Sequence, residues 1–135
     1  MAAFPLVAVA VATLAAFMAG GLWYGPLFGK AWQARQNWSE ADKARAKAGM
    51  GRLFATTLVC EAVVASVLVH VLGQIPHDPA ITLMVTLGTA VGFVIPALAV
   101  NYGYAQKQAM VLAIDAGHWL VVFLTMGLIF VAFRV

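Results

Sequence analysis

The sequence predicts an all-α fold: an integral membrane four-helix bundle with a short cytoplasmic helix between its first two spans. Only 10% of the 135 residues are charged and 64% are hydrophobic, whereas a soluble domain carries about 25% charged residues. The apolar residues form four runs, at about 4–24, 53–72, 80–102 and 109–133. Crossing a bilayer takes about 20 apolar residues in a helix, so each run is long enough. The length fits a single transmembrane domain over residues 1–135 and leaves no room for a separate soluble enzyme.

The first run, residues 4–24, is expected to be a retained transmembrane helix. Met1–Pro5 carries no Lys or Arg, whereas a secretory signal peptide starts with a positively charged segment. The run is also longer than the apolar region of a typical signal peptide. We therefore expect no cleavage after it.

The end of the first run is rich in aromatic residues around a proline. Trp23, Tyr24 and Trp32 flank Pro26, which should end or kink the helix. The plain interpretation is a helix stop with aromatic anchors at the level of the lipid headgroups. A sharper one is a re-entrant corner, in which Tyr24, Pro26 and Trp32 form a cytoplasmic lid over the polar cluster described below.

The first connection predicts a short helix of its own. Ser39 is followed three positions later by Asp42, a pattern typical of a helix N-terminus. An Ala-rich, charged segment follows, so we expect a helix from about Glu40 to Lys47. Gly49 and Gly51 should break it before the second span.

The second run, residues 53–72, contains the only cysteine, Cys60, so no intrachain disulfide can form. We expect Cys60 to be a small buried hydrophobe. The run ends at Gln74–Pro79, where two prolines predict a tight turn into the third span. Pro96 lies inside the third run and should kink that helix.

The basic residues set the predicted topology. The first and third connections must lie on the same side of the membrane, and they hold all but one of the eight Lys and Arg residues. Loops rich in Lys and Arg stay in the cytoplasm. We therefore expect a multi-pass protein of the cytoplasmic (inner) membrane with both termini outside the cytoplasm. This topology explains the net charge of +3 better than nucleic-acid binding does.

Glycines at every fourth position suggest close helix packing. Such rows let helix backbones approach within the membrane. The lipid bilayer is one partner, and the rows also predict a homo-oligomer or docking on a larger membrane complex. The residues are Gly21, Gly25 and Gly29 in the first row, and Gly88 and Gly92 in the third span.

A few polar residues lie inside the runs, where each is costly unless it pairs or serves a function. With a rise of about 1.5 Å per residue, Glu61 lies roughly 15 Å from the cytoplasmic edge, His118 roughly 13 Å and Asp115 roughly 9 Å. Glu61 and His118 are therefore predicted to pair, and Asp115 shares a helix face with His118. Thr57 and Asn101 are expected on the cytoplasmic side of this cluster. His70 lies roughly 28 Å deep and is excluded, together with any haem held between His70 and His118.

Three interpretations of the cluster remain open. It is a structural network that fixes helix positions, a proton or ion path built from Asp, Glu and His, or a metal site with two carboxylates and one imidazole. No sequence motif identifies a cofactor. A hydrolase is disfavoured because the sequence lacks a nucleophile elbow, an HExxH motif and a phosphate loop.

The segment Trp23–Trp32 resembles the hallmark of the bacterial membrane family called domain of unknown function 1761. Gly49–Gly51, Asn101 and Ile114–His118 are also similar to that family, and the resemblance covers nearly the whole chain. It implies a compact integral membrane protein of four helices. It implies no activity, substrate or cofactor.

Two functions follow from the residues. The first is a small transport-like or ion- or proton-conducting bundle that uses the polar cluster. The alternative is a non-catalytic structural or accessory subunit of a homo-oligomer or larger membrane complex. An enzyme is not expected.

Overall fold

The computed structural model describes residues 5–135, which contain helices and no strands. Phe4, the expected start of the first span, lies outside the described residues, as do the preceding residues on which the argument against a signal peptide rests. In chain order the elements are α1 (Leu6–Leu22), the π-helix η1 (Trp23–Leu27), α2 (Gly29–Gln33), α3 (Glu40–Ala48), α4 (Met50–Leu72), α5 (Pro79–Thr89), the π-helix η2 (Ala90–Val94), α6 (Ile95–Tyr104) and α7 (Ala109–Phe133).

Four helical stretches are long and apolar enough to cross a membrane, so the predicted all-α, four-helix membrane bundle is confirmed. They are Leu6–Leu27, Met50–Leu72, Pro79–Tyr104 and Ala109–Phe133. The first continues past Tyr24 because Pro26 is accommodated inside the π-helix η1 and does not end the helix. A π-turn shifts the hydrogen-bonding pattern by one residue and often marks a functional position.

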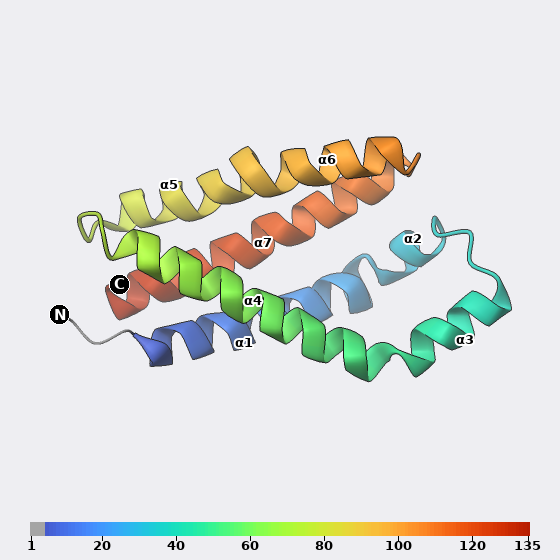
Figure 1. The fold of residues 1–135 in the computed structure, drawn as a ribbon, viewed down its shortest axis with the longest axis horizontal. Helices are drawn as coiled ribbons and strands as arrows, with labels where there is room; N and C mark the ends of the chain where they lie inside the picture. The colour runs from blue at the N-terminus through green and yellow to red at the C-terminus, as the bar shows by residue number, and fades with distance from the viewer. Residues whose placement is uncertain (1–4) are drawn as a thin grey trace.

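Helix α7 is the centre of the bundle. It packs against α1 and against α5, while α4 packs mainly on α1 (Figure 1). Phe123, Met126 and Phe130 of α7 are fully buried, and they meet alanines of α1 and α4 that include Ala12 and Ala65. Large side chains on one helix facing small ones on its neighbours give a closely packed interface. Helix α1 begins and α7 ends at the same end of the molecule, as an even number of crossings requires (Figure 1).

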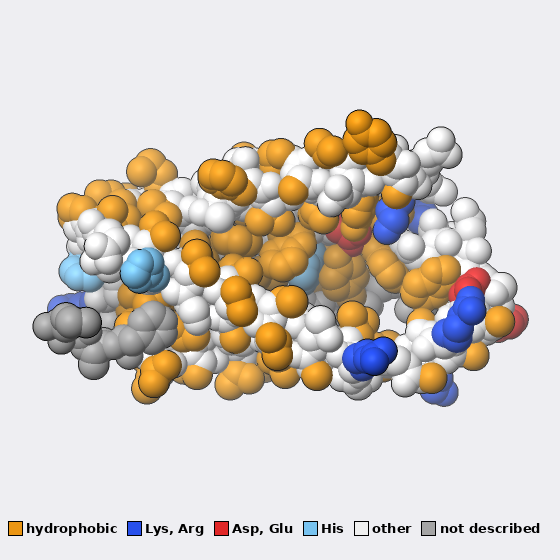
Figure 2. Space-filling model, in the orientation of Figure 1, with side chains coloured by type: hydrophobic (Ala, Val, Ile, Leu, Met, Phe, Trp, Pro, Cys, Tyr) orange, Lys and Arg blue, Asp and Glu red, His pale blue; other side chains and the backbone are white. Residues whose placement is uncertain are grey.

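The outer surface of the bundle is apolar, as a surface facing lipid should be. Phe93 is 75% exposed and Met18 is 69% exposed, and hydrophobic side chains cover much of the face in Figure 2. Cys60 is also exposed, so the expectation of a buried cysteine is wrong. Cys60 lies on an outward face of α4, where a small apolar side chain can face lipid.

The helix expected in the first connection is confirmed as α3. Its N-terminus carries a capping box, in which the Ser39 Oγ accepts from the Asp42 N–H at 3.2 Å and the Asp42 carboxylate accepts from the Ser39 N–H at 2.9 Å. The Ser39 hydroxyl also donates to the Asp42 carboxylate, at 2.7 Å. This hydrogen bond, the one from the Ser39 N–H and the Arg45 guanidinium hold the pKa of Asp42 below its usual value. The break before α4 falls at Gly49, and Gly51 lies within α4.

The third span changes its helix type beside its proline, and the kink expected at Pro96 stays a prediction. The π-helix η2 ends directly before α6, and Pro96 occupies the first turn of α6. A proline there costs no α6 hydrogen bond, because the first N–H groups of a helix have no partner within it. The predicted turn before α5 is also present, and Asp78 caps α5 by accepting from the Ile81 N–H at 3.0 Å.

The predicted glycine rows do not mediate helix contacts within the chain. A Cβ added at Gly21, Gly25, Gly88 or Gly92 would meet nothing within 4 Å. Gly29 is different, because a Cβ there would collide with the Tyr24 carbonyl at the exit of η1. Spacing identifies a row of small residues but not the side of the helix that faces a neighbour, and these rows face outward.

Candidate functional site

One carboxyl group joins three of the four spans. Asp115 of α7 is only 6% exposed. Its Oδ1 accepts a hydrogen bond from the Tyr24 hydroxyl at 2.5 Å, and its Oδ2 accepts one from the Tyr102 hydroxyl at 2.6 Å. Tyr24 belongs to η1 and Tyr102 to α6. Both oxygens of this buried carboxyl group are therefore hydrogen-bonded, which avoids the cost of leaving them without a partner.

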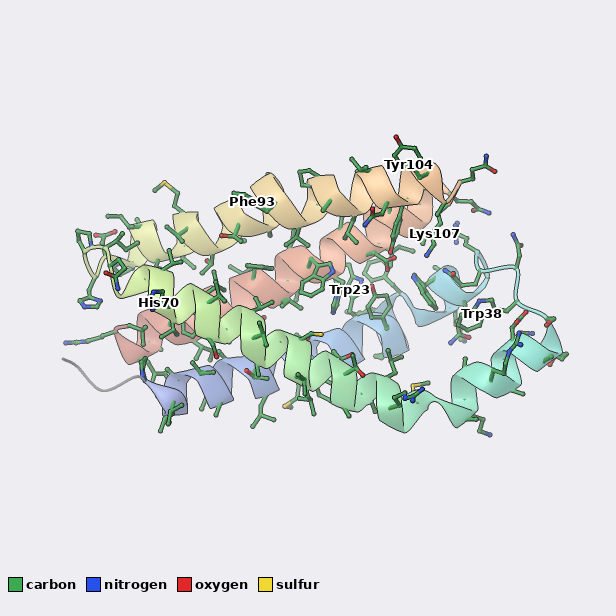
Figure 3. All side chains as sticks on the ribbon, in the orientation of Figure 1. Trp23, Trp38, His70, Phe93, Tyr104 and Lys107 are labelled. Atoms are coloured by element: carbon green, nitrogen blue, oxygen red, sulfur yellow. The ribbon has the colours of Figure 1, made fainter. Side chains whose placement is uncertain are left out.

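The π-helix η1 places two consecutive side chains on α7. Trp23 precedes Tyr24 and donates its Nε1–H to the Ile114 carbonyl at 3.0 Å. Its ring lies against Gly117, where an added Cβ would be 2.7 Å from a ring carbon. Trp23 therefore lies between the first and fourth spans (Figure 3). Gly117 is the residue that lets the indole approach the backbone of α7 closely.

His118 lies one helical turn beyond Asp115 and is 8% exposed. Its ring is 4.8 Å from that of Tyr24, measured between centroids. A Cβ on Gly20 would be 2.9 Å from the His118 Nε2, so the absence of a side chain at Gly20 makes room for the imidazole. Tyr24 thus contacts both titratable residues of α7.

The aromatic corner continues from Tyr24 towards α3. The Trp32 ring lies edge-on to Tyr24 at 5.7 Å, and Trp38 lies edge-on to Trp32 at 5.6 Å. The indole N–H of Trp32 is buried and has no hydrogen-bond partner within residues 5–135. Tyr24 donates to the Asp115 carboxyl group and Trp32 lies against Tyr24, whereas Pro26 is exposed.

Glu61 is buried, but it does not pair as expected. It is 1% exposed, and neither of its carboxyl oxygens has a hydrogen-bond partner among residues 5–135. The predicted hydrogen bond to His118 is therefore wrong. The depth of a residue along its helix does not fix the direction of its side chain, and α4 packs mainly on α1, whereas Asp115 receives its hydrogen bonds from η1 and α6.

The other residues of the predicted cluster lie apart from Asp115. The Thr57 hydroxyl donates to the Leu53 carbonyl of its own helix at 2.9 Å. Asn101 is exposed, and so is His70, which the depth argument excluded. Within residues 5–135, no three His, Cys, Asp or Glu side chains are arranged to hold a metal ion, so the metal-site interpretation does not fit the geometry.

Tyr102 is the site residue that sequence reasoning missed. It precedes Asp115 by 13 residues, across the turn between α6 and α7. The depth argument used backbone positions only, and it ignored the length of a tyrosine side chain, which reaches deeper than its Cα. The signal was a tyrosine near the end of one span and an aspartate near the start of the next.

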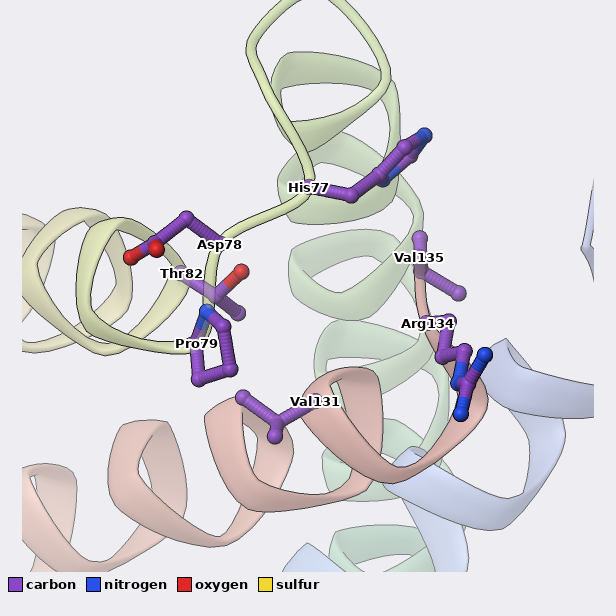
Figure 4. Close-up of a pocket in the computed structure, with 7 residues that line it drawn as sticks. All are labelled: His77, Asp78, Pro79, Thr82, Val131, Arg134 and Val135. Carbon is purple, nitrogen blue, oxygen red and sulfur yellow. The ribbon is translucent and has the colours of Figure 1, made fainter.

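Neither of two clefts in the part of the chain that the structure describes is lined by Asp115, His118 or Glu61. The larger, about 430 Å³, lies between the start of α5 and the end of α7. Figure 4 shows that its charged side chains do not converge, because Asp78 points away from His77 and Arg134. The smaller cleft, about 250 Å³, lies between the segment after α2 and the turn that joins α6 to α7.

Comparison with known families gives one match. Residues 7–131 match the family described as "Protein of unknown function (DUF1761)". Comparison with curated proteins and with solved structures found no match. The family assignment brings no activity with it.

Proposed function

We propose that this chain, which belongs to the DUF1761 family, is a small multi-pass protein that moves a proton or a small cation through its helix bundle. The observation that carries the proposal is Glu61. Its carboxyl group is buried in a spanning helix, and neither oxygen has a hydrogen-bond partner in the described chain. An unpaired buried charge is costly unless a proton or a cation neutralises it. Glu61 is therefore the exchangeable site in this proposal.

Asp115 and His118 form the next part of the path. Both oxygens of Asp115 accept hydrogen bonds from tyrosine hydroxyls, which fix the position of the carboxyl group in the bundle. His118 lies one turn away, at a depth between those of Asp115 and Glu61. Because no hydrogen bond joins Glu61 to His118, transfer between them requires water or a side-chain movement. A proton entering at the Asp115 end would pass to His118 and then to Glu61.

The orientation is part of the proposal. The first and third connections hold nearly all the basic residues, and Lys and Arg side chains gather mostly at the α3 end of the bundle (Figure 2). Basic loops remain cytoplasmic. We place the protein in the cytoplasmic membrane. The Asp115 end of the path would then face the cytoplasm, and both termini would lie outside it.

A second candidate function is a structural or accessory subunit. Gly21 and Gly25 have open space where a side chain would be, so another helix can approach this row closely. The Asp115 network also fits a purely structural role, since it ties three spans together.

The test is ion flux into liposomes that contain the purified protein. An imposed membrane potential drives uptake, which a trapped pH-sensitive dye reports for protons and a sodium-sensitive dye for Na⁺. Glu61→Gln removes the exchangeable carboxyl group and should abolish most of the flux. Glu40→Gln makes the same chemical change on the exposed surface of α3 and should leave the flux unchanged. Wild-type flux no higher than that of empty liposomes would exclude conduction and favour the accessory role.

A further inference from the structure

The smaller cleft is lined mainly by side chains that can donate hydrogen bonds. Its volume is about 250 Å³, below the range of about 300–1,000 Å³ that is typical for drug-sized ligands. One wall comes from the segment after α2 and the other from the turn between α6 and α7. The polar residues of the two walls are Arg35, Gln36, Asn37, Gln106, Lys107 and Gln108.

Two cations face this cleft, and no acidic residue lines it. Within residues 5–135 the ion pairs are Lys43–Glu40 and Arg45–Asp42 on α3, so Arg35 and Lys107 belong to neither. One Arg35 nitrogen donates to the Ala31 carbonyl at 2.7 Å, and a guanidinium group retains further N–H groups for a ligand. The uncompensated charge favours an anion.

Lys107 lies beside the cleft and is connected through Tyr102 to Asp115 of the candidate functional site. Its Nζ lies 4.5 Å from the centroid of the Tyr102 ring, a cation–π contact that fixes the direction of the ammonium group. Tyr102 in turn donates to Asp115. Figure 3 shows Lys107 at the same end of the molecule as Trp38.

With the four spans across a bilayer, the cleft would lie at the level of the lipid headgroups. Lys107 is in the turn between the end of one span, Tyr104, and the start of the next, Ala109. At that level the anion available in quantity is phosphate, and Arg and Lys are its usual ligands. We propose that this cleft binds a phosphate group, with Arg35 and Lys107 as the charged ligands and the neighbouring amide side chains as further donors. This proposal does not depend on ion conduction.

The phosphate can come from an anionic lipid headgroup or from free phosphate, and two arms of one experiment distinguish them. In the first arm, native mass spectrometry counts phosphatidylglycerol retained by the protein in mild detergent, with phosphatidylcholine as the reference lipid. In the second, inorganic phosphate is titrated against the unfolding temperature of the protein in pure phosphatidylcholine nanodiscs. Retention in the first arm identifies a lipid ligand, and a rise in unfolding temperature in the second identifies a free one.

The cleft variant and its control each lose two positive charges. Arg35→Gln/Lys107→Gln should lower phosphatidylglycerol retention or phosphate affinity by roughly tenfold or more, as expected for the loss of two basic contacts. Lys47→Gln/Arg52→Gln removes two exposed basic residues elsewhere in the first connection and should change neither. Gln108→Glu adds a negative charge to the cleft while both cations remain, so it should also lower binding.

Two results would overturn the proposal. One is that the wild type shows neither preference for phosphatidylglycerol nor a response to phosphate. The other is that the Lys47→Gln/Arg52→Gln control loses as much binding as the cleft variant, because the interaction would then be general attraction between a basic surface and an anionic ligand. Circular dichroism of each variant confirms that its helices are intact.

Discussion

Two buried carboxyl groups in this protein have opposite surroundings. Asp115 accepts a hydrogen bond at each oxygen from a tyrosine, whereas Glu61 has no partner at either. Burial alone therefore does not tell a structural carboxyl group from a functional one in a membrane. A fully satisfied group fixes helix positions, and an unsatisfied one requires a ligand or a proton.

Removing the hydroxyl group of one of the two tyrosines that donate to Asp115 should destabilise the bundle. Tyr102→Phe leaves the Asp115 Oδ2 buried without its donor, which costs about 1–3 kcal/mol. Tyr104→Phe is the control, because Tyr104 is 91% exposed and its hydroxyl group makes no hydrogen bond in the described chain. Denaturant unfolding in detergent measures both. Equal stability of the two variants would show that the hydrogen bond from Tyr102 contributes nothing.

The depth of a residue along its helix could be predicted from the sequence, but the direction in which its side chain points could not. The rise per residue placed Glu61, Asp115 and His118 inside the membrane, and all three are buried. It could not show that Glu61 and His118 make no hydrogen bond to each other. The importance of Tyr102 was hidden for a related reason, since a side chain reaches several ångströms from its backbone.

Among the elements, the π-helix η1 accounts for the largest difference from the sequence-based expectations. Pro26 does not end the first helix but lies inside η1, which carries Trp23 and Tyr24 to α7. The spans themselves were predictable because bilayer thickness fixes their length. Their ends depend on local features such as the Gly49 cap, which hydropathy does not report.

The contact between η1 and α7 predicts that two glycines will respond differently to the same substitution. Gly117→Ala places a Cβ about 2.7 Å from the Trp23 ring, and such overpacking costs typically 1–3 kcal/mol. Gly88→Ala adds a Cβ in open space and should be neutral or stabilising, because alanine favours a helix. Thermal unfolding followed by circular dichroism compares them. A Gly117→Ala protein as stable as Gly88→Ala would contradict the close packing of Trp23 on α7.

The cap of α3 predicts a pH dependence of its own. The pKa of Asp42 is lowered by its hydrogen bonds to Ser39 and by Arg45. A lowered pKa stabilises the folded helix above the ordinary aspartate value, and this contribution is lost as the pH falls through the folded-state pKa. Amide hydrogen exchange in α3 should therefore speed up at acidic pH relative to the intrinsic rate. The acid effect should disappear in Asp42→Asn, and its persistence there would assign it to another group.

On the scale of the whole molecule, a bundle of four spans has little interior, and α7 contributes more buried residues to it than any other helix. The predicted architecture is confirmed. It could be predicted because the composition of the chain and the length of its apolar runs are enough to determine it. Self-association and docking on a larger complex stay predictions, as the outward-facing glycine rows neither require nor exclude a second chain. The same apolar exterior that meets lipid would also meet a partner helix.

The central claim is that the Glu61 carboxyl group carries the exchanged ion. The most direct test compares proton or Na⁺ uptake into liposomes for Glu61→Asp and Glu61→Gln at equal protein content. The account predicts measurable uptake with Glu61→Asp, which keeps a carboxyl group, and loss of most of it with Glu61→Gln. Equal uptake by the two variants, whether high or absent, would contradict the claim.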